Sequence, residues 1–135
     1  MFAIPAFAAH DQAEATKAVS TFTDNYTKAF NAKDVTAIVA MFVPDGVEAG
    51  PGPMLTSRDD IEKRFKTIFN SGATDILFDI KQVQAEGNIV FAVGQFTVKV
   101  PDTILDGNVI NIFEWDGDAL KYRVHGYNFL PPPQQ

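Results

Sequence analysis

The sequence predicts an α+β fold in which three N-terminal helices pack in a curved antiparallel β-sheet. Up to Gly72, apolar side chains recur every three or four residues, which is the period of a helix with one buried face. Beyond Gly72 they recur at every second residue, which is the period of a strand. Helices and strands that follow each other in separate runs are typical of this class, and 135 residues fit one domain.

Each of the three predicted helices carries a boundary signal or an apolar stripe. The stripe of the first, within residues 11–31, consists of Val19, Phe22 and Tyr26. Asp34 can cap a short second helix that ends at Pro44. Ser57, followed three residues later by Asp60, resembles a capping box for a third helix that Gly72 ends.

The remainder of the chain is predicted as one loop and four strands. Residues 44–56 contain three glycines and three prolines, which indicates a loop with at most a short strand at 47–49. The strands are expected at residues 75–85, 88–100, 108–115 and 120–129. Alternation along the last of them places His125 with Lys121 and Arg123 on an outward face, and a one-residue shift would turn His125 inward.

Composition excludes several classes of function. The net charge of −6 makes nucleic acid an unexpected partner, because phosphate binding needs a positive surface. The absence of cysteine excludes disulfides, a thiolate nucleophile and thiolate metal ligands. Two histidines form no metal-ligand cluster, and no dinucleotide fingerprint occurs, so no metal and no cofactor are expected. No membrane association is expected from this globular composition either.

Both ends of the chain differ from the domain at residues 11–130. Residues 1–10 are apolar and contain Ala6-Phe7-Ala8, which resembles the end of a signal peptide. They are therefore either a signal remnant, which would place the protein in the periplasm or outside the cell, or an apolar arm of a cytoplasmic protein. Residues 131–135 form a proline-rich tail that cannot extend a sheet.

Both faces of the strand at 108–115 are apolar over much of their length. Asn111 and Phe113 share one face with Trp115, whereas Ile110 and Ile112 lie on the other. An outer face as apolar as the inner one predicts that a second copy of the chain covers it. We therefore expect a homodimer through the outer sheet face.

The sequence resembles the ketosteroid isomerase-like branch of the nuclear transport factor two-like superfamily, and more closely its SnoaL-like and calcium/calmodulin kinase association-type domains of unknown function. The resemblance covers residues 12–130 and is carried by Tyr26 with Asp34 and by the segments AFNAKDVTAIVAMF, SRDDI, NIFEWDGD and LKYRVHGYNF. The resemblance implies a cystatin-like cone with an apolar pocket and dimerisation through the outer sheet face. Members of this superfamily include isomerases, cyclases, dehydratases and domains that only bind a ligand.

The resemblance also implies roles for particular positions. In the ketosteroid isomerases, a tyrosine donates a hydrogen bond to the substrate oxygen, and this tyrosine corresponds to Tyr26. The protonated aspartic acid that donates a second hydrogen bond to this oxygen corresponds to Asn111, whose amide can still donate. A supporting tyrosine corresponds to Phe65. The general-base aspartate falls on Gly50, so steroid isomerisation is not expected, because that reaction needs a base within reach of the substrate.

These residues leave three functions open. The leading hypothesis is a domain that binds a small apolar molecule with a polar group, and its candidate ligand-binding residues are Tyr26, Asn111, Phe65, Phe113 and Trp115. The second is an isomerase, cyclase or hydratase with a different base, for which the candidate catalytic residues are Asp45, Glu48 and His125. The third is an association module in which the sheet face is the functional surface.

Overall fold

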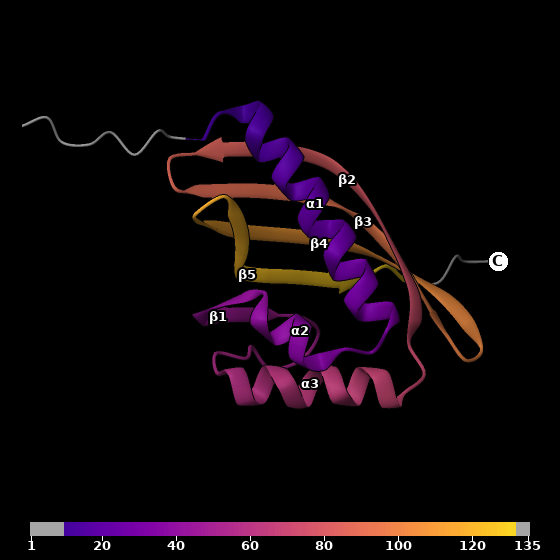
Figure 1. Ribbon diagram of the computed structural model, residues 1–135. Coiled ribbons are helices and arrows are strands. Elements are labelled where there is room, and N and C mark those ends of the chain that lie inside the picture. Colours follow the sequence, from indigo (N-terminus) through magenta and orange to yellow (C-terminus); the bar gives the residue numbers. More distant parts are fainter. Residues whose placement is uncertain (1–9, 132–135) are drawn as a thin grey trace, which may run out of the picture.

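The structure, a computed structural model, describes residues 10–131 and has three helices and five strands in that range (Figure 1). The helices are α1 (Gln12–Asn31), α2 (Val35–Ala40) and α3 (Arg58–Asn70). The strands are β1 (Phe42–Ala49), β2 (Thr74–Glu86), β3 (Ile89–Val100), β4 (Thr103–Asp116) and β5 (Ala119–Phe129). They form one sheet in the order β1-β5-β4-β3-β2, and α1 crosses the face of this curved sheet. The predicted α+β class is confirmed.

The helix starts follow the capping signals in the sequence. The Asp34 carboxylate accepts a hydrogen bond from the backbone N–H of Ala37 at 3.0 Å. The Ser57 hydroxyl accepts one from the N–H of Asp60 at 3.2 Å. Such caps satisfy N–H groups that have no partner within the helix. The stripe of α1 that includes Tyr26 is buried, as its spacing predicts.

β1 is longer than the short strand at 47–49 that the sequence pattern predicts. The predicted loop at 44–56 begins only after Ala49, because β1 pairs in parallel with β5 at Phe42 and again at residues 47–49. The pairing is irregular between Phe42 and Val47, and this irregularity accommodates Pro44, which has no N–H to donate to a ladder. β1 therefore adds a parallel edge to four strands that pair antiparallel to one another.

β4 begins at Thr103, five residues earlier than the sequence pattern suggests. Asp106-Gly107 has the composition of a turn, but both residues pair with β3. A Cβ atom at Gly107 would lie 2.3 Å from the Asn128 carbonyl oxygen and from the Phe96 ring. Gly107 is thus a place of close approach inside the sheet and not a turn residue.

The outer face of the sheet carries the apolar patch from which a dimer is expected. Phe91, Val93 and Ile110 are exposed by 42%, 36% and 57%, and Val93 lies opposite Ile110 in the β3–β4 pairing. A patch of this kind on adjacent strands is typical of a surface that another chain covers. The homodimer stays a prediction.

The compartment prediction rests on the N-terminal residues, most of which the structure does not describe. Residues 1–9 and 132–135 lie outside the described residues, so the signal-remnant and tail predictions concern a part of the chain on which the structure is silent. Within residues 10–131, no helix is long and apolar enough to cross a membrane.

Candidate functional site

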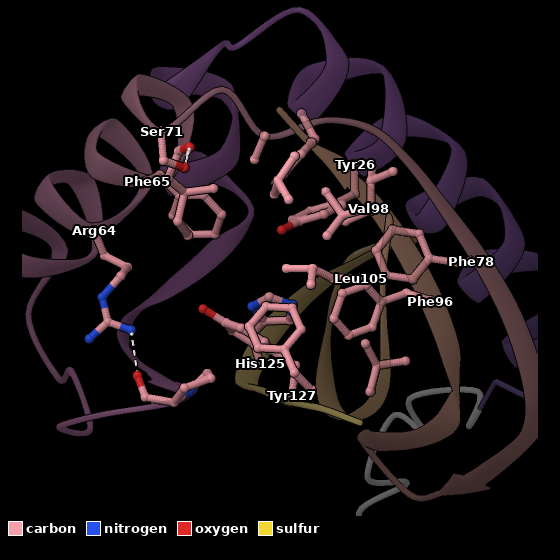
Figure 2. Close-up of a pocket in the computed structure, with 18 residues that line it drawn as sticks. Tyr26, Arg64, Phe65, Ser71, Phe78, Phe96, Val98, Leu105, His125 and Tyr127 are labelled. Carbon is pink, nitrogen blue, oxygen red and sulfur yellow. Dashed lines mark hydrogen bonds between the residues drawn. The ribbon is translucent and has the colours of Figure 1, made fainter. Parts of the chain in front are cut away.

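The sheet and helices enclose a cavity of about 290 Å³ between α1, α3 and the inner faces of β2 to β5 (Figure 2). Most of its wall is apolar, including Phe30, Phe65, Phe78, Phe96, Val98 and Leu105. The size is at the lower end of the range for small-molecule sites and is about twice that of an engineered cavity that binds benzene. It is therefore large enough for an aromatic ring with a short chain.

Polar side chains gather in one part of this apolar wall. Figure 2 shows Tyr26, His125 and Tyr127 facing the same cavity, with the rings of Phe78 and Phe96 beside them. The His125 ring centroid lies 5.6 Å from that of Tyr26 and 5.1 Å from that of Tyr127. α1 and β5 thus bring two hydroxyl groups and one imidazole to the same region of the cavity.

Tyr26 lies where the sequence predicts, on the buried face of α1 and in the cavity wall. Only 2% of its surface is exposed. Burial raises the pKa of the Tyr26 hydroxyl well above its usual range, and the neighbouring Tyr122 and Glu48 side chains add to the rise. The group is consequently a neutral phenol that can donate a hydrogen bond to a bound molecule.

His125 faces inward, so the sequence-based placement on the outer face is wrong. Leu120 and Tyr122 are buried at alternate positions, but the next buried residues on β5 are His125 and Gly126. The β4–β5 register shifts between Ile112 and Phe113, and this bulge moves the remainder of β5 to the other phase. His125 is only 3% exposed as a result.

Glu48 lies next to His125 and is fully buried. The two residues are opposite each other in the β1–β5 pairing, and Glu48 Oε1 lies 3.5 Å from His125 Nδ1. Neither carboxylate oxygen has a hydrogen-bond partner among residues 10–131. An ionisable group without solvent normally needs such a partner, so this pair is an unusual feature of the core. Glu48 itself does not belong to the cavity wall.

Asp45 lies outside the cavity on an exposed part of β1. Its carboxylate forms a 2.8 Å ion pair with the Arg123 guanidinium, which lowers the pKa of Asp45 through hydrogen bonding. The side chain is 80% exposed. Among the three candidate catalytic residues, the structure thus brings together Glu48 and His125 and separates Asp45 from them.

Tyr127 and Arg64 are cavity residues that the candidate set from the sequence lacks. Burial raises the pKa of the Tyr127 hydroxyl, the Glu48 carboxylate adds to the rise, and the Arg64 guanidinium opposes it. A Cβ atom at Gly50 would lie 2.5 Å from Tyr127 Cζ and 2.6 Å from its hydroxyl oxygen. Tyr127 therefore occupies the space into which a side chain at Gly50 would extend. Residues two apart on a strand lie on the same face, so the spacing of Tyr127 from His125 is the sequence signal that relates Tyr127 to the site.

The other candidate ligand-binding residues have different surroundings. Phe65 lines the cavity. Asn111 is 5% exposed and lies opposite His125 in the β4–β5 pairing, but it does not belong to the wall. Phe113 is in the core, where it stacks on Tyr122. Trp115 lies beneath the His10 ring at a centroid distance of 3.6 Å, in a separate cleft beside α1.

The described residues offer no evident metal centre. Within residues 10–131, no group of three histidine, cysteine, aspartate or glutamate side chains is arranged to hold a metal ion. The side chains in the cavity wall can themselves supply hydrogen bonds, an ion pair and proton transfer.

Three helices pack against a curved five-stranded sheet and form a cone with an apolar cavity inside. This arrangement defines the nuclear transport factor two-like, cystatin-like fold class. Residues 22–126 match the SnoaL-like domain family, and the chain belongs to that family. The fold of this family commonly binds small ligands. Among curated proteins, no sequence matches the chain.

Solved structures with this fold differ widely in sequence from the chain. A ketosteroid isomerase-like protein from Erwinia carotovora atroseptica has a TM-score of 0.76 at 20% identity, with 90% of this chain and 100% of that chain covered. A nuclear transport factor two-like protein of unknown function from Shewanella oneidensis has 0.74 at 16%, with 84% and 98% covered. A cystatin-like protein of unknown function from Nostoc punctiforme has 0.73 at 11%, with 87% and 92% covered. At these identities the likeness establishes the fold alone.

Proposed function

We propose that the cavity binds a small apolar molecule whose polar group meets the hydroxyls of Tyr26 and Tyr127. The observation that carries the proposal is an apolar cavity of about 290 Å³ with a buried, neutral tyrosine hydroxyl in its wall. Apolar walls supply binding free energy through burial, while a few polar groups fix the orientation of the bound molecule. A carbonyl oxygen is the simplest acceptor for these donors.

We expect 4-phenylbutan-2-one, an aromatic ring with a short chain and a ketone, to bind the wild-type protein saturably at one molecule per chain. In the Leu105→Trp variant the larger side chain takes up cavity space, and binding is expected to weaken by about tenfold or more. Ligand-observed NMR titration measures both affinities.

Ile104→Trp is the matched control, because Ile104 is the neighbouring residue on β4, is 63% exposed and does not line the cavity. This variant should bind the ketone as the wild type does. The proposal would be overturned by the absence of saturable binding to the wild type, or by a folded Leu105→Trp variant with wild-type affinity.

The second candidate function is an enzyme that uses His125 as the base, and the buried contact between Glu48 and His125 favours it. Glu48 lies 3.5 Å from Nδ1, so it can orient the imidazole and stabilise the imidazolium that proton uptake creates. His125 also lines the cavity beside Tyr26, which can donate a hydrogen bond to a developing enolate oxygen. The arrangement suits the removal of a proton next to a carbonyl group.

If His125 acts in this way, the bound ketone should exchange its α-protons for deuterium in D₂O. His125 would take the α-proton, the C–H electron pair would form the enolate, and solvent would return a deuteron to carbon. NMR measures the loss of the α-proton signal. His125→Gln should reduce exchange to the rate in buffer while retaining ketone binding. Exchange by the wild type at the buffer rate would rule out this second function.

A further inference from the structure

Arg64 is the only lysine or arginine in the cavity wall formed by the described residues. It extends from α3 and is half-buried. Its Nη1 donates a hydrogen bond to the Pro51 carbonyl at 3.2 Å, and Nη2 approaches the Pro53 carbonyl at 3.5 Å (Figure 2 shows the side chain beside the cavity). The loop after β1 therefore holds the guanidinium in one place at the cavity, where a bound molecule can meet it.

This guanidinium has no carboxylate partner within ion-pairing distance among residues 10–131. The contrast with Arg123 is informative, because Arg123 pairs with both Asp45 and Glu114 on the protein surface. A guanidinium has five N–H donors in a rigid planar arrangement, and two carbonyl acceptors do not saturate them. The remaining donors match the two oxygens of a carboxylate.

The Tyr127 hydroxyl lies close enough to Arg64 for the guanidinium to act on it electrostatically. A carboxylate between these two groups could accept hydrogen bonds from both. The Glu48 carboxylate also acts on the Tyr127 hydroxyl, but Glu48 does not belong to the cavity wall. Among the described residues, Arg64 is therefore the one permanently charged side chain that lines the cavity. A single positive charge balances a carboxylate but only half of a phosphate dianion, which favours the carboxylate.

We infer that the physiological ligand is a small apolar carboxylic acid, whose carboxylate pairs with Arg64 and the Tyr127 hydroxyl while its apolar part fills the cavity. This inference rests on the proposed function and specifies its ligand class. The apolar part of the acid would point toward Val98, Leu105 and Phe96, which belong to the apolar wall of the cavity.

The experiment compares two ligands of nearly the same shape, 3-phenylpropanoate and 4-phenylbutan-2-one, in which a carboxylate oxygen replaces the methyl group of the ketone. The wild type should bind the acid about fivefold more tightly than the ketone, the size expected for a partly exposed ion pair. Arg64→Gln should remove this preference, so that the acid and the ketone bind this variant with equal affinity. Isothermal titration calorimetry at low ionic strength measures all four affinities.

Lys66→Gln is the matched control, because it removes the same charge from the same helix at an exposed side chain outside the cavity. It should retain the preference for the acid. Equal binding of the two ligands by the wild type, or a preference that survives in Arg64→Gln, would overturn the carboxylate inference while ketone binding upholds the cavity proposal. Failure of the wild type to bind either ligand would overturn both.

Discussion

Replacing His125 by leucine is expected to lower the free energy of unfolding by about 3–5 kcal/mol, because it removes one member of a buried pair of ionisable side chains. Glu48 is fully buried and His125 Nδ1 lies 3.5 Å from its carboxylate. No water-exposed position is available to Glu48 unless β1 separates from β5, with which it pairs at this point. Urea denaturation, followed by circular dichroism, measures the loss.

The double variant Glu48→Leu/His125→Leu is the decisive comparison. With both ionisable groups replaced by apolar side chains, no uncompensated polar group remains, and the double variant should be more stable than His125→Leu alone. The two substitutions are then strongly non-additive, as expected for residues in contact. Additive effects, or a loss below about 1 kcal/mol for His125→Leu, would show that the pair is not energetically coupled.

The same cycle separates the roles of the pair in stability and in chemistry. If the pair serves only folding, replacing both residues by leucine should leave ketone binding intact, because the Tyr26 hydroxyl remains in the cavity wall. If the pair serves proton transfer, every variant of the cycle should lose α-proton exchange, however stable that variant is. Stability and exchange therefore report on different properties of the same two residues.

The helical part of the fold could be predicted from the sequence because its signals are local. Asp34 and Ser57 cap the helices that follow them, and the spacing that includes Tyr26 defines a buried stripe within one element. These signals depend on residues at most a few positions apart. The position of Tyr26 in the cavity follows from the same stripe.

The inward orientation of His125 could not be predicted in this way, because it depends on pairing with another strand. Nothing in the residues from Lys121 to Tyr127 interrupts the alternating pattern, yet the bulge opposite Ile112 and Phe113 reverses the phase of β5. The same limitation concealed most of β1, which becomes a strand only through its parallel pairing with β5. Consequently, the candidate set included His125 but assigned it to the surface, and it omitted Tyr127 altogether.

Gly50→Ala is expected to destabilise the protein by about 1–3 kcal/mol, the usual cost of adding an atom to a packed site. The new Cβ atom would lie 2.5 Å from Tyr127 Cζ, so the Tyr127 ring would have to move into the cavity. The backbone at Gly50 is not in the left-handed region, unlike that at Gly52, so the clash is the dominant cause. Thermal and urea unfolding measure the effect, and ketone affinity should fall as the ring enters the cavity.

In a Tyr127→Ala background the same Gly50→Ala substitution should cost little, because the atoms that the Cβ would meet are gone. An equal cost in both backgrounds would contradict the close packing of Gly50 against Tyr127. A larger side chain at this position, such as aspartate, would also have to extend through the space that Tyr127 fills. Gly50→Asp should therefore give a folded protein only together with Tyr127→Ala, because the tyrosine ring fills the space that the carboxylate side chain needs.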